Sequence, residues 1–170
     1  EHITKEKLLS LSLGNFKNYD KDGDAFYDII SAFQKSIRGS DVDASLYYLA
    51  LLIDSEDLDT IYRRMSVIAY EDIGLANPNI GPFVHAAIET AKMLGLPEAR
   101  IPLANAVIQL ALSVKSNTAI TAIDSALSEI KTNPKFVIPD HLRDSHYYGA
   151  DKLNRGVGYK YPHSHPSGYI

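Results

Sequence analysis

The chain has 170 residues, of which 45% are hydrophobic and 22% are charged, a balance typical of a folded globular protein. Its net charge of −4 excludes the general basic character of a stand-alone nucleic-acid-binding protein, so contact with DNA would need a local patch. The absence of cysteine excludes disulfides and thiolate metal sites. Without a long apolar run or a signal-peptide pattern, we expect a cytoplasmic protein with no membrane partner.

Helical patterns follow one another along most of the chain. A short helix is predicted over residues 3–13, ahead of a Gly–Asn stop signal. Hydrophobic side chains then recur at helical spacing from Asp24 to Ile37, and the turn Gly39–Asp41 ends this helix and caps the next. The same spacing predicts further helices over roughly residues 46–53, 58–73, 82–94, 97–114 and 116–132.

These elements predict an all-α fold, a helical bundle of stacked antiparallel hairpins in which the apolar stripes of the helices pack against one another. Phe136–Pro139 is expected to be short, extended and buried, but no second strand exists to form a sheet with it. Residues 145–170 hold five of the 11 tyrosines and four of the 10 glycines, which predicts an ordered but irregular tail.

Two groups of side chains suggest metal ions, and a simpler interpretation is favoured for both. The acidic run Asp20–Asp24 has Ala25 and Ser31 where a calcium-binding EF-hand loop needs Gly and Glu, so we interpret it as a charged turn before a helix. His163 and His165 could approach one ion, but no third ligand is fixed by spacing. The sequence therefore predicts no metal site.

Glu71 and Asp72 lie in the last turn of a predicted helix, where the helix dipole disfavours acidic side chains. The residues one turn earlier are apolar and offer no basic partner. We therefore expect one of these acids to pair with a cation from another helix, with Arg38, Arg64 and Lys115 as candidates. A role between subunits is the alternative.

Lys115 and Ser116 lie at the joint between two predicted helices, where Ser116 can cap the second one. Binding of an anion such as phosphate is the alternative, since helix N-termini attract anions. No phosphate-binding loop, dinucleotide-binding fingerprint, zinc-protease motif or nucleophile elbow occurs in the chain. Without a loop that holds a triphosphate, we expect no ATP hydrolysis and no cofactor in this chain.

Longer motifs are more specific than these patterns. The stretch Tyr19–Ala50 closely resembles the start of the C-terminal domain of the RarA/MgsA family of AAA+ ATPases, relatives of clamp loaders that include the Werner-helicase-interacting protein of eukaryotes. The pair Phe33–Gln34 departs from the Leu–His expected there. The resemblance continues, in the family's order, through Glu71–Ala76, Lys115–Asn117, Pro139–Arg143 and Gly158–His163.

The resemblance implies a domain organisation. Residues 1–18 would be the end of the AAA+ lid region or a linker, residues 19–144 a helical C-terminal oligomerisation domain similar to a clamp-loader collar, and residues 145–170 an irregular tail of the same domain. It also implies a homotetrameric, nucleoid-associated parent protein with DNA-stimulated ATPase activity at stalled replication forks. That parent would bind DNA and single-stranded-DNA-binding protein, with ATP and Mg²⁺ in an upstream module missing here.

Three roles are open for the chain itself. As an oligomerisation and interaction module, it would use exposed aromatic side chains as interface anchors, with Tyr147, Tyr148, Tyr159 and Tyr161 as candidates. As a DNA-contacting module, it would bind phosphates through basic side chains, with Lys35, Arg38, Arg63, Arg64, Lys115, Arg143 and Lys160 as candidates. The third role is a small-molecule enzyme that uses Glu71, Asp72 and a histidine as acid and base.

Overall fold

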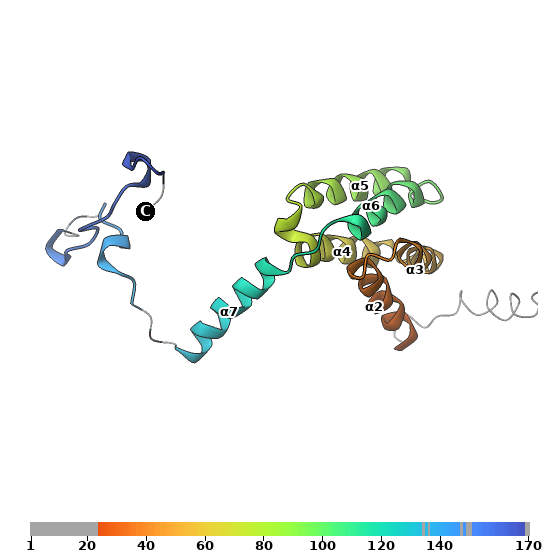
Figure 1. Ribbon diagram of the computed structural model, residues 1–170, viewed down its shortest axis with the longest axis horizontal. Helices are drawn as coiled ribbons and strands as arrows, with labels where there is room; N and C mark the ends of the chain where they lie inside the picture. Colours follow the sequence, from red (N-terminus) through yellow and green to blue (C-terminus); the bar gives the residue numbers. More distant parts are fainter. Residues whose placement is uncertain (1–23, 134, 136, 147, 149–150, 169–170) are drawn as a thin grey trace, which may run out of the picture. The chain divides into compact units, whose positions relative to one another are not determined.

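The structure, a computed structural model, describes residues 24–133, 135, 137–146, 148 and 151–168. Contacts divide the chain into two compact units, one ending at Asp124 and one beginning at Ser125, and each is described by itself. The described residues form helices and turns and no strand, so the all-α prediction is confirmed (Figure 1). The helix predicted over residues 3–13 lies outside the described residues.

Helices α2 (Asp24–Arg38) and α3 (Val42–Asp54) form the first hairpin. The buried face of α2 repeats every three or four residues and consists of Phe26, Ile30, Phe33 and Ile37. In the connecting turn, the Asp41 carboxylate accepts a hydrogen bond of 2.9 Å from the backbone N–H of Ala44, which satisfies a free donor at the start of α3. The predicted turn therefore ends one helix and caps the next.

Helix α4 (Leu58–Ile68) is capped by Asp57, whose side chain accepts a hydrogen bond of 3.2 Å from the backbone N–H of Thr60. It continues into a π-helical turn, η2 (Ala69–Ile73), and a short 3₁₀ turn, η3 (Gly74–Ala76). Gly74, the first residue of η3, has a φ of 46°, in the left-handed region that glycine adopts without the cost of a side chain.

Helices α5 (Ile80–Leu94) and α6 (Arg100–Leu112) form the second hairpin and lie side by side (Figure 1). Pro82 and Pro102 both fall in the first turn of their helix, where the missing N–H costs no helical hydrogen bond. Helix α6 also contacts α3 and α2, so the two hairpins share one core. The largest fully buried side chains of this core include Phe33, Ile37, Leu52, Ile61, Met65, Ile68, Ile73, Val84, Leu103 and Leu110.

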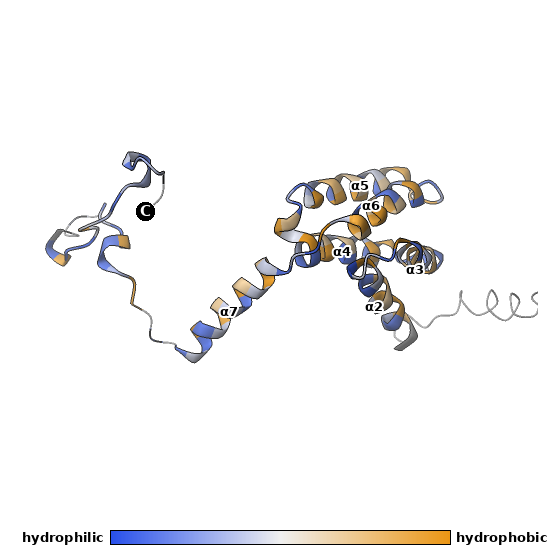
Figure 2. Cartoon of the chain, in the orientation of Figure 1, coloured by the Kyte–Doolittle hydropathy of each residue, from blue (hydrophilic) through white to orange (hydrophobic). Residues whose placement is uncertain are grey.

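Helix α7 (Thr118–Thr132) differs from the others because no side chain in it is buried. Ile123, Leu127 and Ile130 are 56%, 48% and 59% exposed, although hydrophobic residues recur along the helix (Figure 2). The predicted packing of apolar stripes is therefore right for α2–α6 and wrong for α7. Periodicity indicates that a helix has an apolar face, but it does not say which chain covers that face.

The residues after α7 form three short 3₁₀ turns, η4 (Asp140–Leu142), η5 (Asp151–Leu153) and η6 (Pro162–Ser164), joined by irregular segments. The expected burial of Val137 and Ile138 is wrong, since these side chains are 80% and 50% exposed, while Phe136 lies outside the described residues. Their apolar character predicted a core position, but the described residues around them leave both side chains half exposed or more. No described helix has the length and apolar character to span a membrane.

Candidate functional site

Polar and charged side chains from α2, α4 and η2 meet beside the linker that precedes α7. We call this cluster the polar junction; it consists of Gln34, Arg38, Arg64, Glu71, Asp72 and Lys115. The Arg38 Nε donates to Asp72 Oδ1 at 2.6 Å, and its Nη2 lies 3.4 Å from Glu71 Oε1. Arg38 on α2 is thus the cation that the structure pairs with both acids.

Gln34 extends the network between helices. Its Nε2 donates to Asp72 Oδ2 at 3.3 Å, and its Oε1 accepts from Arg64 Nη1 at 2.9 Å. Sequence reasoning missed this residue as a site member, although it is half of the pair that departs from the family pattern. The departure was visible in the sequence, but no local signal showed that its amide reaches an acid 38 positions away.

Burial makes the pairing of Asp72 necessary. Its side chain is 6% exposed, whereas that of Arg38 is 49% exposed. A carboxylate removed from water needs hydrogen-bond donors and an opposite charge to remain ionised without a large cost. The hydrogen bond to Asp72 raises the pKa of Arg38, although desolvation acts in the opposite direction. The arrangement links the C-terminal end of α2 to η2.

Lys115 fixes the linker between α6 and α7. Its ammonium donates to the backbone oxygens of Ala111 at 2.8 Å and Ser113 at 2.6 Å and to Ser40 Oγ at 3.0 Å. These contacts use all three donors of the group, so a phosphate would have to displace one of them. Burial lowers the pKa of Lys115, which the nearby Asp72 carboxylate partly offsets.

The next residue is held as well. The backbone N–H of Ser116 donates to the carbonyl oxygen of Asp72 at 2.8 Å. A cavity of about 450 Å³ lies beside this contact and carries both signs of charge, from Arg38 and Lys115 and from three acids. Both of its cations bind atoms of the chain. Ile120 and Asp124 of α7 also line it.

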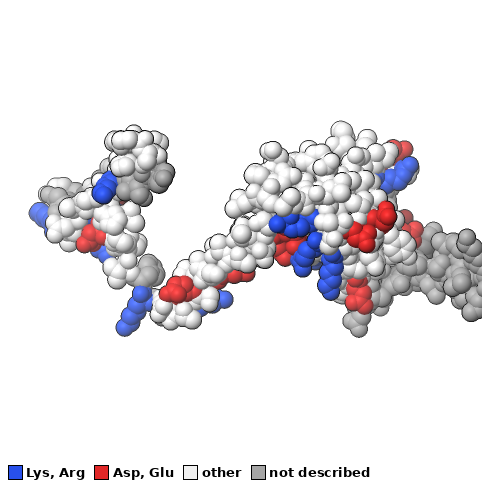
Figure 3. All heavy atoms as spheres, viewed as in Figure 1, with Lys and Arg blue, Asp and Glu red and all other residues white. Residues whose placement is uncertain are grey.

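The remaining predicted phosphate contacts are not part of this cluster. Lys35 and Arg63 are exposed, on α2 and α4, and Figure 3 shows basic side chains gathered over these helices with acidic ones next to them. In the tail, Arg143 lies 3.2 Å from Asp140 and donates to a backbone oxygen, while Lys160 is exposed. The structure therefore brings together three of the seven predicted cations.

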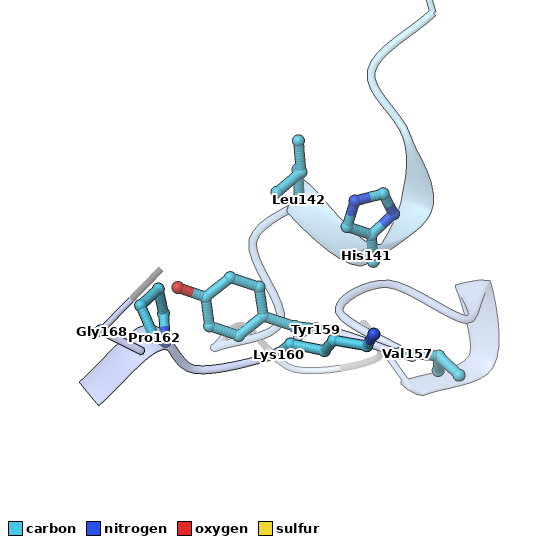
Figure 4. Close-up of a pocket in the computed structure, with 8 residues that line it drawn as sticks. His141, Leu142, Val157, Tyr159, Lys160, Pro162 and Gly168 are labelled. Atoms are coloured by element: carbon cyan, nitrogen blue, oxygen red, sulfur yellow. The ribbon is translucent and has the colours of Figure 1, made fainter. Parts of the chain in front are cut away.

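A pocket of about 730 Å³ lies within the tail. Figure 4 shows His141 and Leu142, from η4, across from Tyr159 and Lys160. Of the other predicted aromatic anchors, Tyr148 is fully exposed, Tyr161 lies with its ring 5.1 Å from that of His163, and Tyr147 lies outside the described residues. Within the described part of the chain, no three acidic or histidine side chains are grouped closely enough to bind a metal ion.

The α2–α6 bundle also has apolar hollows that the sequence did not reveal. One of two beside α6, the α3/α6 groove, has a volume of about 520 Å³; its walls include Leu46, Leu49, Ala50, Ile53, Ile101, Ala104 and Ile108. A neighbouring hollow between α5 and α6 contains the half-exposed Phe83, Leu94 and Ile101. In the sequence, hydrophobic residues that line a surface hollow have the same helical spacing as residues of the core.

Known proteins match this chain over its full length. The family described as MgsA AAA+ ATPase C terminal matches residues 39–170, and the family described as AAA C-terminal domain matches residues 1–38. Replication-associated recombination protein A of Bacillus subtilis is 57% identical over 99% of the chain, and the Escherichia coli K12 protein of that name is 35% identical over 99%. The ATPase WRNIP1 of Dictyostelium discoideum is 34% identical over 95%.

The chain spans 40%, 38% and 19% of the lengths of these three relatives, so it corresponds to one part of a longer protein in each case. The matched part is described by its position after an ATPase module, in agreement with the absence of a phosphate-binding loop from the sequence. The resemblance inferred from the motifs is confirmed. The chain belongs to the MgsA AAA+ ATPase C-terminal family.

Proposed function

We propose that this chain is the assembly and interaction module of a larger AAA+ ATPase that acts in DNA replication and recombination. The observation that carries this proposal is the exposed apolar face of α7. An isolated helix of 15 residues is marginally stable in water, and most helical stability in proteins comes from packing of an apolar face. A second surface that covers α7 would supply that packing.

The half-exposed hydrophobic side chains on α5 and α6 support the same role. Phe83, Leu94 and Ile101 lie close enough to line one hollow, and grouped exposed apolar side chains are typical of protein interaction surfaces. The polar junction, by contrast, is satisfied within the chain. Its acids pair with Arg38 and link α2 to η2 within one chain.

For the whole protein, we carry over what the family resemblance implies. The parent would be a homotetrameric ATPase, with ATP and Mg²⁺ bound in the module that precedes this chain. Contacts with DNA and with single-stranded-DNA-binding protein would belong to the assembled parent. In this proposal, nucleotide binding and hydrolysis belong to the upstream module, and contacts between subunits belong to this chain.

Light scattering tests the assembly role. The 170-residue chain is expected to have a mass several times the 18.8 kDa of one copy at high micromolar concentration, with four copies as the family-based expectation. Leu127→Lys should lower this mass, because it places a charge in the apolar face of α7, whereas Ser128→Lys should not. A strictly monomeric wild-type chain would contradict the proposal.

DNA contact is the second candidate function, and the gathering of basic side chains over α2 and α4 favours it (Figure 3). The exposed Lys35 and Arg63 would bind phosphates there. Binding of a single-stranded oligonucleotide, followed by fluorescence anisotropy, should then weaken steeply with added salt and weaken further in Lys35→Gln and Arg63→Gln. Absent or salt-insensitive binding would remove this candidate.

A further inference from the structure

We propose that α7 of one copy docks in the α3/α6 groove of a second copy, so that neighbouring chains are joined by a donated helix. This inference rests on the proposed assembly function and names the two surfaces that meet. Among the described residues, one surface is an apolar helix face in which no side chain is buried, and the other is an apolar groove. Both belong to the same chain, so a second copy supplies the complement of each.

The donated surface consists of Ile123, Leu127 and Ile130. Their spacing of four and three residues places them on one side of α7, and each is about half exposed or more. At a rise of 1.5 Å per residue, this face is about 10 Å long. It therefore presents two turns of helix with a continuous apolar side.

The accepting surface has the same length. The α6 wall of the groove runs from Ile101 to Ile108, which is also about 10 Å of helix, and α3 supplies the opposite wall. Ile101 is 53% exposed at one end of that wall. A helix laid between α3 and α6 would complete a three-helix contact, the usual way in which an amphipathic helix fills an apolar groove.

Charges at the edges of the two surfaces also match. The groove is bordered by one acid, Asp54, and one base, Arg100. The last turn of α7 likewise carries one acid, Glu129, and one base, Lys131. A docked helix can thus oppose Glu129 to Arg100 and Lys131 to Asp54, which fixes its direction in the groove.

The linker explains why the groove would be filled by another copy rather than by the chain's own α7. Ser116 is hydrogen-bonded to Asp72 and Lys115 to the end of α6, so α7 starts at the polar junction. Its first half faces that junction, where Ile120 and Asp124 line the cavity. The part of α7 in the first compact unit, residues 118–124, lines no part of the α3/α6 groove. A helix that docks on a second copy leaves these linker contacts in place.

Such a contact joins two different surfaces, so each copy gives a helix on one side and receives one on the other. Contacts of this kind generate a closed ring when the rotation between copies closes. A ring with the same contact at every joint agrees with the assembly proposed above, and it makes each subunit depend on both of its neighbours.

Chemical crosslinking tests the pairing, because the natural chain contains no cysteine. Leu127→Cys on α7 and Ala104→Cys in the groove would be purified separately, mixed, and treated with a short bifunctional maleimide. The mixture should give a covalent dimer of one copy of each variant. The matched control is a mixture of Ala104→Cys with Ser128→Cys, which moves the thiol off the apolar face and should lose this dimer.

Other outcomes would overturn the inference. A dimer formed by Leu127→Cys alone would show that two α7 helices pair with each other. A crosslink within the double variant, without one in the mixture, would show that α7 folds back on its own chain. If light scattering finds an assembly but the mixture gives no crosslink, this pairing fails while the assembly function stands, whereas a monomeric chain removes both.

A charge exchange gives a second test. Arg100→Glu should reduce the mass measured by light scattering, because it opposes Glu129 with a like charge. Adding Glu129→Lys to the same chain should restore the mass, since each groove then meets a helix of opposite charge. If the double variant remains as dissociated as Arg100→Glu, the proposed direction of the helix is wrong.

Discussion

Asp72 and Ser45 are the polar side chains buried in the described part of the chain, and the carboxylate of Asp72 receives hydrogen bonds from both Arg38 and Gln34. The sequence led to this acid because a carboxylate near a helix C-terminus breaks the dipole rule and needs a cation from elsewhere. It could not choose among three cations, since that choice depends on how α2 and η2 pack. Gln34 is uncharged, so the search for a basic partner did not identify it.

Replacement of Arg38 measures the strength of this contact. Arg38→Met leaves Asp72 buried without its opposite charge and should lower the free energy of unfolding by about 2 kcal/mol, less than for a fully buried pair because Arg38 is half exposed. Lys35→Met, in the same last turn of α2, should change it by less than about 0.5 kcal/mol. Urea denaturation distinguishes these outcomes, and equal effects would contradict the assignment.

Asp144 offers a pH-dependent prediction in the tail. Hydrogen bonds from the backbone N–H and then the ring of His146 hold the pKa of its carboxyl below the ordinary 3.8. Because the pKa is lowered in the folded chain, these bonds form fully above the ordinary value and are lost as the pH falls through the lowered one. In an NMR titration, His146→Ala should raise the pKa only partway, since the backbone donor remains; an unshifted wild-type pKa would disprove these contacts.

At the level of elements, the helices of the bundle were predictable because caps and apolar spacing agree. Asp41 and Asp57 cap helices where the pattern restarts, and glycine punctuates the ends. The π-helical turn η2 was not predictable, because such single turns are rare within helices and no residue pattern marked this one. The sequence also did not show that the apolar face of α7 is exposed, because exposure depends on packing between elements and not on local spacing.

Gly74 tests how closely η2 and the linker fit. A Cβ at this position would lie 3.3 Å from the carbonyl oxygen of Ser116, and the residue has a φ of 46°. At Gly39, a Cβ would also lie 3.3 Å from a backbone oxygen, but φ is outside the left-handed region. Gly74→Ala should therefore destabilise the chain by at least about 1 kcal/mol more than Gly39→Ala, as measured by thermal or urea unfolding. Equal losses would mean that crowding, not φ, sets the cost.

For the whole molecule, sequence motifs identified the family, while the helical spacing of hydrophobic residues predicted its all-α class. Neither the motifs nor the spacing could locate the surface through which we propose that copies of the chain assemble. A groove between helices arises from the gap left by packed side chains, and the apolar residues that line it follow the same periodicity as core residues. The α3/α6 groove thus became visible when α3 and α6 were placed side by side.

Hydrogen exchange of α7 as a function of protein concentration tests the central claim most directly, because it reports whether another copy covers this helix. In the concentrated chain, the backbone amides of α7 should be protected, and dilution should remove that protection while the amides of α4 and α6 remain protected. Exchange of α7 at the rate of an unfolded peptide, at concentrations where light scattering shows an assembly, would contradict the account.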